Sequence, residues 1–464
     1  MNPFDISVIA AIATPPGEGA IAIVRVSGEG ALTIADRVFR GAETLAGAAG
    51  YTAHHGRVVT FSGGMVDDVV ALVFRAPHSY TGEDTVEFNC HGGMLVTQEV
   101  LHVLLEAGAR QAGPGEFTRR AFLNGKMDLS QAEAVADLIA ARSERGRLHS
   151  LEQLEGKLGR RVGQLRTALV DLCALLELEL DFSEEGIDLV GRDEIRRRVQ
   201  HVDDALQSMV ETYESGRIAR EGVLVVLAGR TNAGKSSLFN ALLGESRAIV
   251  TGIPGTTRDT IEESLTIDGI LFRLVDTAGL RRANDPVEAE GMSRTRHQVR
   301  YADIVLLVED ASGRVEEEEI EDALHGLLTN QHLIVVFNKT DLVALEKVGI
   351  RYQKFIEDGA IVIGTSVTAN LGIDRLKQCL VQSVTGSWID SSETVVLTNE
   401  RHLDSMVQAR KSLKLTLDGI AAGQPNEFIA FDIREAVSEL GEITGEVTTE
   451  EVLNSIFSRF CIGK

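Results

Sequence analysis

The period of the apolar positions changes three times along the chain. Residues 1–125 contain short apolar runs bounded by glycine and proline clusters, and Ala20–Val26 and Thr85–Cys90 are typical of β-strands. From residue 126 the apolar positions recur three or four residues apart, which indicates amphipathic helices. Unbroken apolar runs return within 219–382, and helical spacing returns after that.

These changes predict a multidomain α/β plus α protein. We expect an N-terminal α/β domain at 1–125, a helical domain in two parts at 126–218 and 383–464, and a Ras-like P-loop domain at 219–382. The helical residues at the end of the chain number roughly 75, which is short for an independent core. We therefore expect them to pack against the earlier helices, so that the P-loop domain is inserted into a discontinuous helical domain.

Local patterns add detail to this outline. The spacing predicts a helix at Met94–Glu106 and one helix from Asp193 to Arg217. The segment Ser130-Gln-Ala-Glu133 predicts a helix capping box, and Ile267-Asp-Gly-Ile270 predicts a β-hairpin turn.

The loop Gly229–Ser237 has the spacing G-x-x-x-x-G-K-S between an apolar run and a helical run. Glycine allows the backbone N–H groups of such a loop to approach a triphosphate closely. Lys235 supplies a charge for the outer phosphates, and the Ser236 hydroxyl is suited to Mg²⁺. The loop predicts a nucleoside triphosphate site.

Two further motifs predict that the nucleotide is GTP. Asp276 ends an apolar run and can hold the Mg²⁺ shell, and Gly279 can donate its N–H to the γ-phosphate. In Asn338-Lys-Thr-Asp341, the carboxylate of Asp341 can accept two hydrogen bonds from guanine that adenine cannot donate. A site built in this way favours guanine over adenine by roughly 10⁴-fold or more. Thr365-Ser-Val367 is the candidate last base-contacting loop, although Ser-Ala is commoner there. The residues expected to contact GTP are Asn232, Ala233, Gly234, Lys235, Ser236, Ser237, Thr251, Gly252, Ile253, Pro254, Gly255, Thr256, Thr257, Asp276, Thr277, Ala278, Gly279, Asn338, Lys339, Asp341, Ser366 and Val367.

Hydrolysis needs a group that orients water. The loop 251–259 has the glycine and proline content of a switch, and Thr257 is the candidate second Mg²⁺ ligand. Leu280 stands where Ras-type enzymes have the water-orienting glutamine, and leucine cannot do this. Glu288 is the best replacement by position, with an exposed helix residue as the alternative interpretation, so the catalytic candidates are Glu288, Lys235 and Asp276. A monovalent cation near Asn232 could supply the charge of a missing arginine finger.

Charge and cysteine content limit the partners and the compartment. The chain has 69 acidic and 46 basic residues, a net charge of −23, which argues against general nucleic-acid binding. The triplet Arg196–Arg198 indicates a solvated helix face, with an RNA contact as the alternative. Four widely separated cysteines fit a reduced cytoplasmic protein. The sequence predicts no membrane span and no secretory signal.

The whole chain resembles the bacterial tRNA-modification GTPase family MnmE, also called TrmE. The resemblance depends on motifs in every part of the chain: Ala13-Thr-Pro-Pro-Gly17, Ser79-Tyr-Thr-Gly-Glu-Asp84, His91-Gly-Gly93, Gly113-Pro-Gly-Glu-Phe117, Arg120-Ala-Phe-Leu-Asn124, Lys126-Met-Asp-Leu129, Gln131-Ala-Glu-Ala134, Gly252-Ile-Pro-Gly-Thr-Thr-Arg-Asp259 and Phe460-Cys-Ile-Gly-Lys464. The last is the most specific, because GTP motifs are shared by many proteins. Tyr80, where relatives have Phe, and Val367 are small departures.

The resemblance implies ligands and partners that the spacing of the motifs does not indicate. It implies 5-formyl-tetrahydrofolate or a related folate bound by Arg25, Glu87, Lys126 and Lys464, and a homodimer formed through the N-terminal domain. It implies K⁺ bound by Asn232, Thr251, Ile253 and Thr256, pairing of the GTP domains across that dimer, and water oriented by Glu288. With a flavoprotein partner, MnmG, the family installs a carboxymethylaminomethyl group at C5 of the wobble uridine of certain tRNAs. Cys461 is the family's terminal cysteine, a possible functional thiol of open role.

Two other functions fit parts of the sequence. A GTP-gated binding module, for example in ribosome assembly, would suit slow hydrolysis caused by Leu280. A folate-binding protein that uses GTP only as a regulator would suit the N-terminal segment. Nucleoside analysis of tRNA and folate titration distinguish these functions from tRNA modification.

Overall fold

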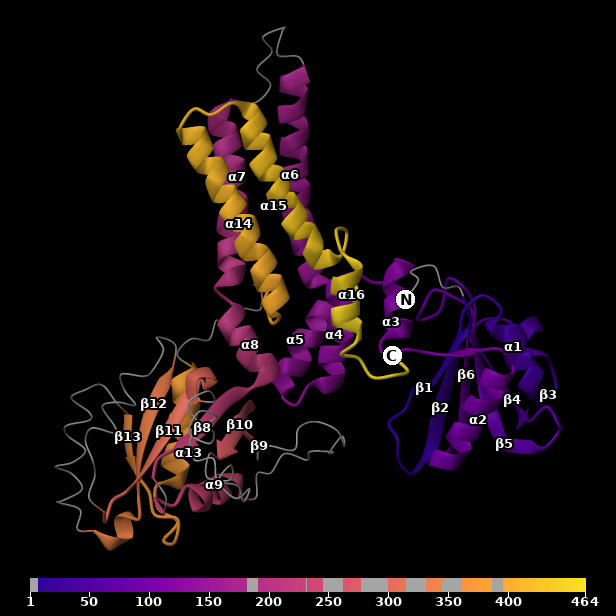
Figure 1. Cartoon of the computed structure of the whole chain (residues 1–464), viewed down its shortest axis with the longest axis horizontal. Helices are drawn as coiled ribbons and strands as arrows, with labels where there is room; N and C mark the ends of the chain where they lie inside the picture. Colours follow the sequence, from indigo (N-terminus) through magenta and orange to yellow (C-terminus); the bar gives the residue numbers. More distant parts are fainter. Residues whose placement is uncertain are drawn as a thin grey trace, which may run out of the picture. The chain divides into compact units, whose positions relative to one another are not determined.

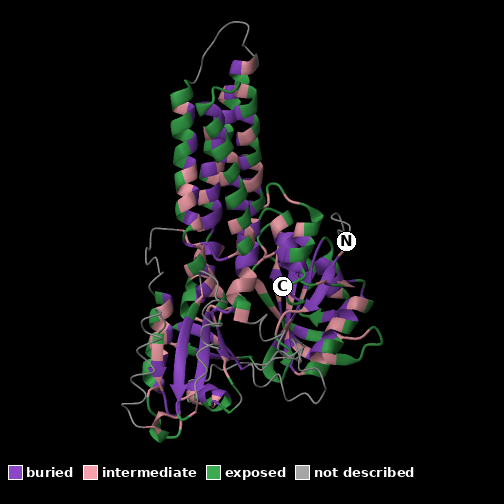
Figure 2. Ribbon diagram, turned by 60° about the vertical axis from the view of Figure 1, so that its left-hand side comes forward, coloured by how far each residue is buried: buried purple, intermediate pink, exposed green. Residues whose placement is uncertain are grey.

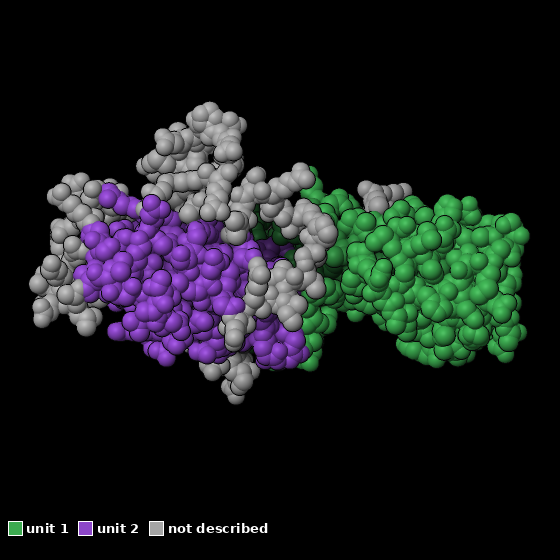
Figure 3. Space-filling view, turned by 90° about the horizontal axis from the view of Figure 1, so that it is seen from below, with its two compact units in different colours: residues 1–139, 151–204, 404–464 green, residues 140–150, 205–403 purple. Residues whose placement is uncertain are grey.

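The structure is a computed structural model that describes residues 7–181, 191–230, 232–244, 262–276, 299–313, 331–343, 361–385 and 395–464. It divides into two compact units (Figure 3). The first comprises residues 1–139, 151–204 and 404–464, and the second comprises 140–150 and 205–403.

The first unit contains a seven-stranded sheet in the order β3-β4-β5-β6-β2-β1-β7. Neighbouring strands are antiparallel except for the parallel pair β1–β7. The strands are β1 (Ile9–Ile12), β2 (Gly19–Ser27), β3 (Phe39–Gly41), β4 (Thr52–Val59), β5 (Met65–Phe74), β6 (Thr85–Gly92) and β7 (Arg110–Gln111). The predicted strands Ala20–Val26 and Thr85–Cys90 are confirmed, each extended by one or two residues.

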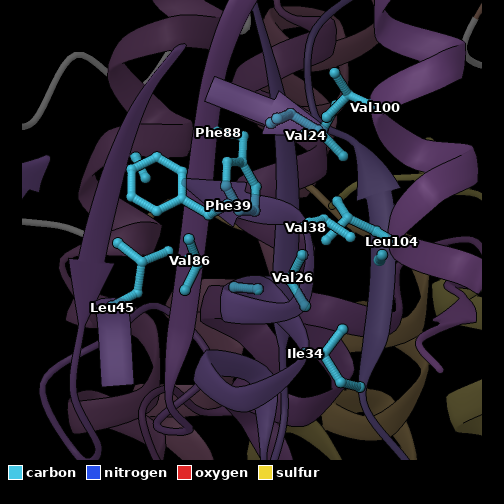
Figure 4. Packing of buried hydrophobic residues seen from close by; sticks show 14 of the residues in the cluster. Val24, Val26, Ile34, Val38, Phe39, Leu45, Val86, Phe88, Val100 and Leu104 are labelled. Carbon is cyan, nitrogen blue, oxygen red and sulfur yellow. The ribbon is translucent and has the colours of Figure 1, made fainter. Parts of the chain in front are cut away.

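One face of this sheet is covered by α1 (Ala31–Val38) and α2 (Met94–Glu106), and the expected bounds of α2 are confirmed. Val24 and Val26 of β2 point into the core with Val100 of α2 (Figure 4). Each fully buried side chain of this kind contributes about 1.5–3 kcal/mol. The alternation of strand side chains leaves Arg25, between the two valines, on the opposite face.

The first unit also contains a helical bundle of α6 (Lys157–Asp181), α7 (Arg192–Val210), α14 (Glu400–Ala421) and α15 (Asn426–Thr444) (Figure 1). Helices α6 and α15 lie side by side and antiparallel: the Asn426 amide donates to Glu179 at one end (2.9 Å), and Arg166 pairs with Glu446 at the other (2.6 Å). Figure 2 shows buried residues on the inward sides of these helices. The final helices therefore pack against the earlier ones, as expected, and the domain boundaries stay a prediction.

The described residues also form the shorter helices α3 (Glu116–Leu123), α4 (Leu129–Ala140), α5 (Glu144–Leu154), α8 (Tyr213–Glu221) and α16 (Glu450–Phe457). The single helix expected at 193–217 is wrong, because α7 ends at Val210 and α8 begins at Tyr213. The capping box expected at Ser130 is also wrong. Asp128 accepts the N–H of Gln131 (2.8 Å), and the Gln131 side chain accepts the N–H of Asp128 (3.0 Å), so the reciprocal cap lies two residues earlier.

The second unit contains a six-stranded sheet in the order β13-β12-β11-β8-β10-β9, parallel except for β9. Its strands are β8 (Val223–Ala228), β9 (Glu262–Ile267), β10 (Ile270–Asp276), β11 (Ile304–Asp310), β12 (His332–Asn338) and β13 (Ile361–Gly364), and its helices include α9 (Lys235–Leu243) and α13 (Ile373–Thr385). Asp268 and Gly269, at φ 49° and 78°, form the predicted hairpin turn. The carboxyl ends of β8, β10, β11 and β12 meet at one edge of the sheet, where parallel α/β folds bind ligands.

Within the described residues, no helix has both the length and the apolar content that crossing a membrane requires. The acidic run at residues 315–320, which predicts the start of a helix, lies outside the described residues.

Candidate functional site

The phosphate-loop sequence forms a tight turn between β8 and α9. Gly229 and Gly234 have φ values of 124° and 95°, which side-chain-bearing residues rarely adopt. A Cβ at residue 229 would lie 2.2 Å from the Val308 carbonyl oxygen, and one at residue 234 would lie 2.2 Å from Asn338 Nδ2. Both glycines are therefore required by close packing against neighbouring strands.

Lys235 and Ser236 begin α9 at the mouth of this loop. The buried Lys235 ammonium donates to the carbonyl oxygens of Gly229 (2.6 Å) and Arg230 (2.5 Å). The Ser236 hydroxyl donates to Asp276 Oδ2 at the end of β10 (2.8 Å). The structure thus joins a hydroxyl and a carboxylate from two motifs forty residues apart, the hard oxygen donors that suit Mg²⁺.

The residues expected to recognise guanine follow β12. Asn338 donates to the Ala233 carbonyl oxygen (3.1 Å) and accepts from the Thr365 hydroxyl (3.3 Å). Lys339 donates to the carbonyl oxygen of Asn232 (2.8 Å) and pairs with Asp310 (2.6 Å). These bonds attach the base-recognition motif to the phosphate loop. Sequence reasoning missed Asp310, since one acid after an apolar run has no distinctive pattern.

Asp341 lies beside the loop after β13. A hydrogen bond from the Ser366 hydroxyl lowers the pKa of the Asp341 carboxyl, so this acceptor is ionised at neutral pH. An ionised acceptor suits the two N–H donors of guanine. Val367 stands where the commoner Ser-Ala motif has alanine. Its side chain is partly buried and packs against the core of the sheet, so the larger residue fits there.

The remaining nucleotide candidates lie outside the described residues. They are Thr251, Gly252, Ile253, Pro254, Gly255, Thr256, Thr257, Thr277, Ala278, Gly279 and Glu288. Their roles in binding GTP, Mg²⁺ and K⁺ stay predictions.

A second set of polar residues lies in the first unit, on the face of the N-terminal sheet opposite the α1–α2 core. Arg25 of β2 and Glu87 of β6 are direct cross-strand partners, and Arg25 Nε donates to Glu87 Oε1 (2.8 Å). The guanidinium carbon lies 5.3 Å from the Tyr80 ring centroid and 5.5 Å from that of Phe117. These contacts fix the orientation of the guanidinium. The two rings were not anticipated, because their proximity to Arg25 arises only from the fold.

Residues 461–464 pack against the segment that contains Phe117, whose ring lies beside Arg25. The Lys464 carbonyl oxygen accepts the N–H of Phe117 (3.1 Å), and Ile462 forms a β-bridge with Pro114. Gly463 has φ 96°, and a Cβ there would lie 2.2 Å from the Ile12 carbonyl oxygen. The segment is therefore packed against the N-terminal domain and is not a frayed tail.

Lys126, the fourth candidate of this set, follows α3. Its ammonium donates to the Pro77 carbonyl oxygen (2.9 Å). Gly82, two residues after Tyr80, packs against the Lys126 side chain: a Cβ there would lie 3.3 Å from Lys126 Cγ. Lys126 therefore packs against the segment 77–82, which also supplies the Tyr80 ring beside Arg25.

The charges of the triplet Arg196–Arg198 are paired along their own helix. Arg196 pairs with Asp193 (3.3 Å), and Arg197 and Arg198 both pair with Glu194. This favours the solvated-face interpretation of the triplet.

The cysteines differ in exposure. Burial raises the pKa of Cys90 and that of Cys173 each to about 11, whereas Cys461 is exposed. A raised pKa keeps a thiol protonated until the pH approaches that value, so at pH 8 only about one in 10³ of these two groups is thiolate.

We expect iodoacetamide at pH 8 to modify Cys461 first, measured by peptide mass spectrometry of the native protein. Equal rates at Cys90 and Cys461 would contradict this.

The sheet, the phosphate loop and the guanine-recognition motif together define a P-loop GTPase of the guanine-nucleotide class. A family model described as the MnmE helical domain matches residues 129–461, and one described as the GTP-binding protein TrmE N-terminus matches residues 8–126. The chain belongs to the MnmE family of tRNA modification GTPases.

Curated relatives match along the whole length. The tRNA modification GTPase MnmE of Chlorobium phaeobacteroides is 47% identical over 463 residues, covering 98% of this chain and 97% of the relative. That of Geobacillus thermodenitrificans is 41% identical over 468 residues, covering all of both chains. Among solved structures, the G domain of the T. maritima FeoB iron transporter is 28% identical, covering 35% of this chain and 99% of that one, with a TM-score of 0.27.

Proposed function

We propose that this GTPase acts with the flavoprotein MnmG to install a carboxymethylaminomethyl group at C5 of the wobble uridine of certain tRNAs. The observation that carries the proposal is the full-length match to relatives named tRNA modification GTPase. The Arg25 site supports it, because residues 461–464 pack against Phe117, whose ring lies beside Arg25, in the same chain that carries the GTP motifs. The reaction would take place in the cytoplasm.

In the nucleotide site, Ser236 and Thr257 would hold Mg²⁺, with Asp276 in its outer shell. The hydrogen bond from Ser236 to Asp276 supports this assignment, because it orients the hydroxyl and supplies a nearby negative charge. Lys235 would neutralise the outer phosphates, and Glu288 would orient the attacking water. Mg²⁺ would stabilise the charge that develops on the transferred phosphoryl group.

We propose that K⁺ binds Asn232, Thr251, Ile253 and Thr256 and that hydrolysis follows pairing of two GTP domains. Of these four residues, only Asn232 lies in the part of the chain that the structure describes. Its φ of 67° is in the left-handed region, within the phosphate loop. We expect GTP turnover to be at least about tenfold faster in KCl than in NaCl at equal ionic strength, because the ion supplies transition-state charge. Asn232→Ala should remove the difference. Equal wild-type rates in the two salts would contradict the cation site.

In the first unit, Arg25, Glu87, Lys126 and Lys464 would bind a 5-formyl-tetrahydrofolate or related folate, with the N-terminal domain forming a homodimer. A carboxylate and a cation held side by side suit a ligand that has both donors and a negative tail. The ion pair is only 15% exposed on each side, which keeps such contacts strong.

The experiment that tests the function is mass analysis of tRNA nucleosides from cells that lack this chain. We expect the carboxymethylaminomethyl uridines to disappear and to return with the wild-type gene but not with Ser236→Ala. Fully modified wobble uridines together with accumulated ribosomal particles would instead favour a role in ribosome assembly.

A further inference from the structure

Asp310 ends β11, the strand that lies between the two strands that carry the nucleotide motifs. In the sheet, β11 has β8 on one side and β12 on the other (Figure 1). The phosphate loop follows β8, and the base-recognition motif at residues 338–341 follows β12. Because the three strands are parallel, their carboxyl ends meet at one edge of the sheet. The end of β11 is therefore placed between the two motifs.

The Asp310 carboxylate is oriented through both of its oxygens. Oδ1 accepts the backbone N–H of Ser312 (2.9 Å) and the Ser312 hydroxyl (2.6 Å). Oδ2 accepts from the ammonium of Lys339 (2.6 Å), which directly follows Asn338, the cross-strand neighbour of Asp310. The turn at Ser312 thus fixes the carboxylate so that its second oxygen faces Lys339.

Lys339 connects this carboxylate to the phosphate loop. The same ammonium donates to the backbone carbonyl oxygen of Asn232 (2.8 Å). Lys339 has a φ of 61° and Asn232 a φ of 67°, a region that residues with a side chain rarely adopt. Such conformations persist where surrounding contacts hold them. The contacts from Asp310 through Lys339 to Asn232 therefore join two strained backbone positions, one in each motif.

The ion pair between Asp310 and Lys339 is suited to placing a group more than to stabilising the sheet. The two side chains are 28% and 34% exposed, and ion pairs that water reaches contribute little to stability. The ladder between β11 and β12 pairs backbone groups along the whole of both strands and does not need this contact. A lysine side chain is long and flexible, so a fixed carboxylate restricts where its ammonium lies.

We propose that Asp310 is a positioning residue for GTP binding. It keeps the Lys339 ammonium on the Asn232 carbonyl oxygen and so sets the separation of the base-recognition motif from the phosphate loop. A nucleotide that contacts both motifs binds more tightly when that separation is already set, because binding does not have to order them. Asp310 acts through Lys339 and not by contact with the nucleotide. The role concerns the GTP site alone, so it does not depend on the flavoprotein or the tRNA.

The test is a double-mutant cycle in the full-length chain, measured as the dissociation constant of a fluorescent GTP analogue. Asp310→Ala removes the carboxylate, and Lys339→Met removes the ammonium but keeps an unbranched side chain. Asp303→Ala is the matched control, because Asp303 precedes the same strand at its other end and pairs with Arg217 (2.5 Å). Thermal unfolding without nucleotide shows whether each variant folds, and Asp310→Asn replaces Asp310→Ala in the cycle if the alanine variant does not.

We expect Asp310→Ala to bind the analogue at least about tenfold more weakly than the wild type, as loss of a hydrogen bond to a charged group does. In the Lys339→Met background the same substitution should change the affinity less than about twofold, because the ammonium that Asp310 holds is already absent. Asp303→Ala should keep wild-type affinity even if its unfolding temperature falls.

Wild-type affinity in the Asp310 variant would overturn the inference. An equal loss of affinity in both backgrounds would also overturn it, because Asp310 would then support the site through the turn at Ser312 and not through Lys339. If Asp303→Ala weakened binding as much as the Asp310 variant, the loss would come from a less stable sheet, and the positioning role would again be wrong.

Discussion

Replacement of Gly234 by alanine is expected to weaken GTP binding by more than about 100-fold. The new methyl group would lie 2.2 Å from Asn338 Nδ2 at a φ of 95°, so the loop and the base-recognition motif could not keep their present separation. Lys235 and Ser236 follow directly and would be displaced with the loop. Titration of a fluorescent GTP analogue measures the loss.

Gly269→Ala is the matched control for this variant. Gly269 has a φ of 78°, and a Cβ there would meet nothing within 4 Å. The control carries the backbone strain without the collision, so it should bind GTP normally. If the two variants bound GTP equally well, the packing account of the phosphate loop would be wrong.

The second large effect is expected at Gly463. Gly463→Ala places a methyl group 2.2 Å from the Ile12 carbonyl oxygen and 3.0 Å from Ala13 Cα, so residues 461–464 cannot stay docked. Because the proposed folate site includes Lys464, we expect 5-formyl-tetrahydrofolate to bind this variant at least about 30-fold more weakly. Calorimetric titration of the full-length chain measures this.

Gly63→Ala, in the same domain, is the control for Gly463→Ala. Its φ of 86° gives comparable strain, and a Cβ there would have open space. Folate affinity should match that of the wild type in this control, and GTP binding should be normal in both variants. Undiminished folate affinity in Gly463→Ala would remove residues 461–464 from the site.

Elements set by local sequence were predictable. The turn at Asp268–Gly269 and the helix Met94–Glu106 depend on neighbours within a few residues, and both are confirmed. The motifs at Lys235, Asp276 and Asn338 were predictable as a group, because a phosphate loop and its partners keep a fixed order along a parallel sheet.

Features set by distant contacts were not predictable. Nothing near Gly463 in the sequence indicates that its backbone touches Ile12, and no spacing relates Tyr80 to Arg25. The capping box was misplaced because Asp128 and Ser130 are both good caps, and only the backbone geometry distinguishes them. The break between α7 and α8 falls in a continuous helical pattern, where tertiary packing overrides propensity.

The pairing of α6 with α15 has a consequence for folding during translation. About 250 residues separate the two helices along the chain, so α6 is synthesised long before its partner exists. In that interval the nucleotide-binding sheet can leave the ribosome and fold. The apolar side chains of α6 that will contact α15 stay exposed to solvent until α15 is synthesised. The nascent chain should therefore be most vulnerable to aggregation, and most dependent on chaperones, midway through translation.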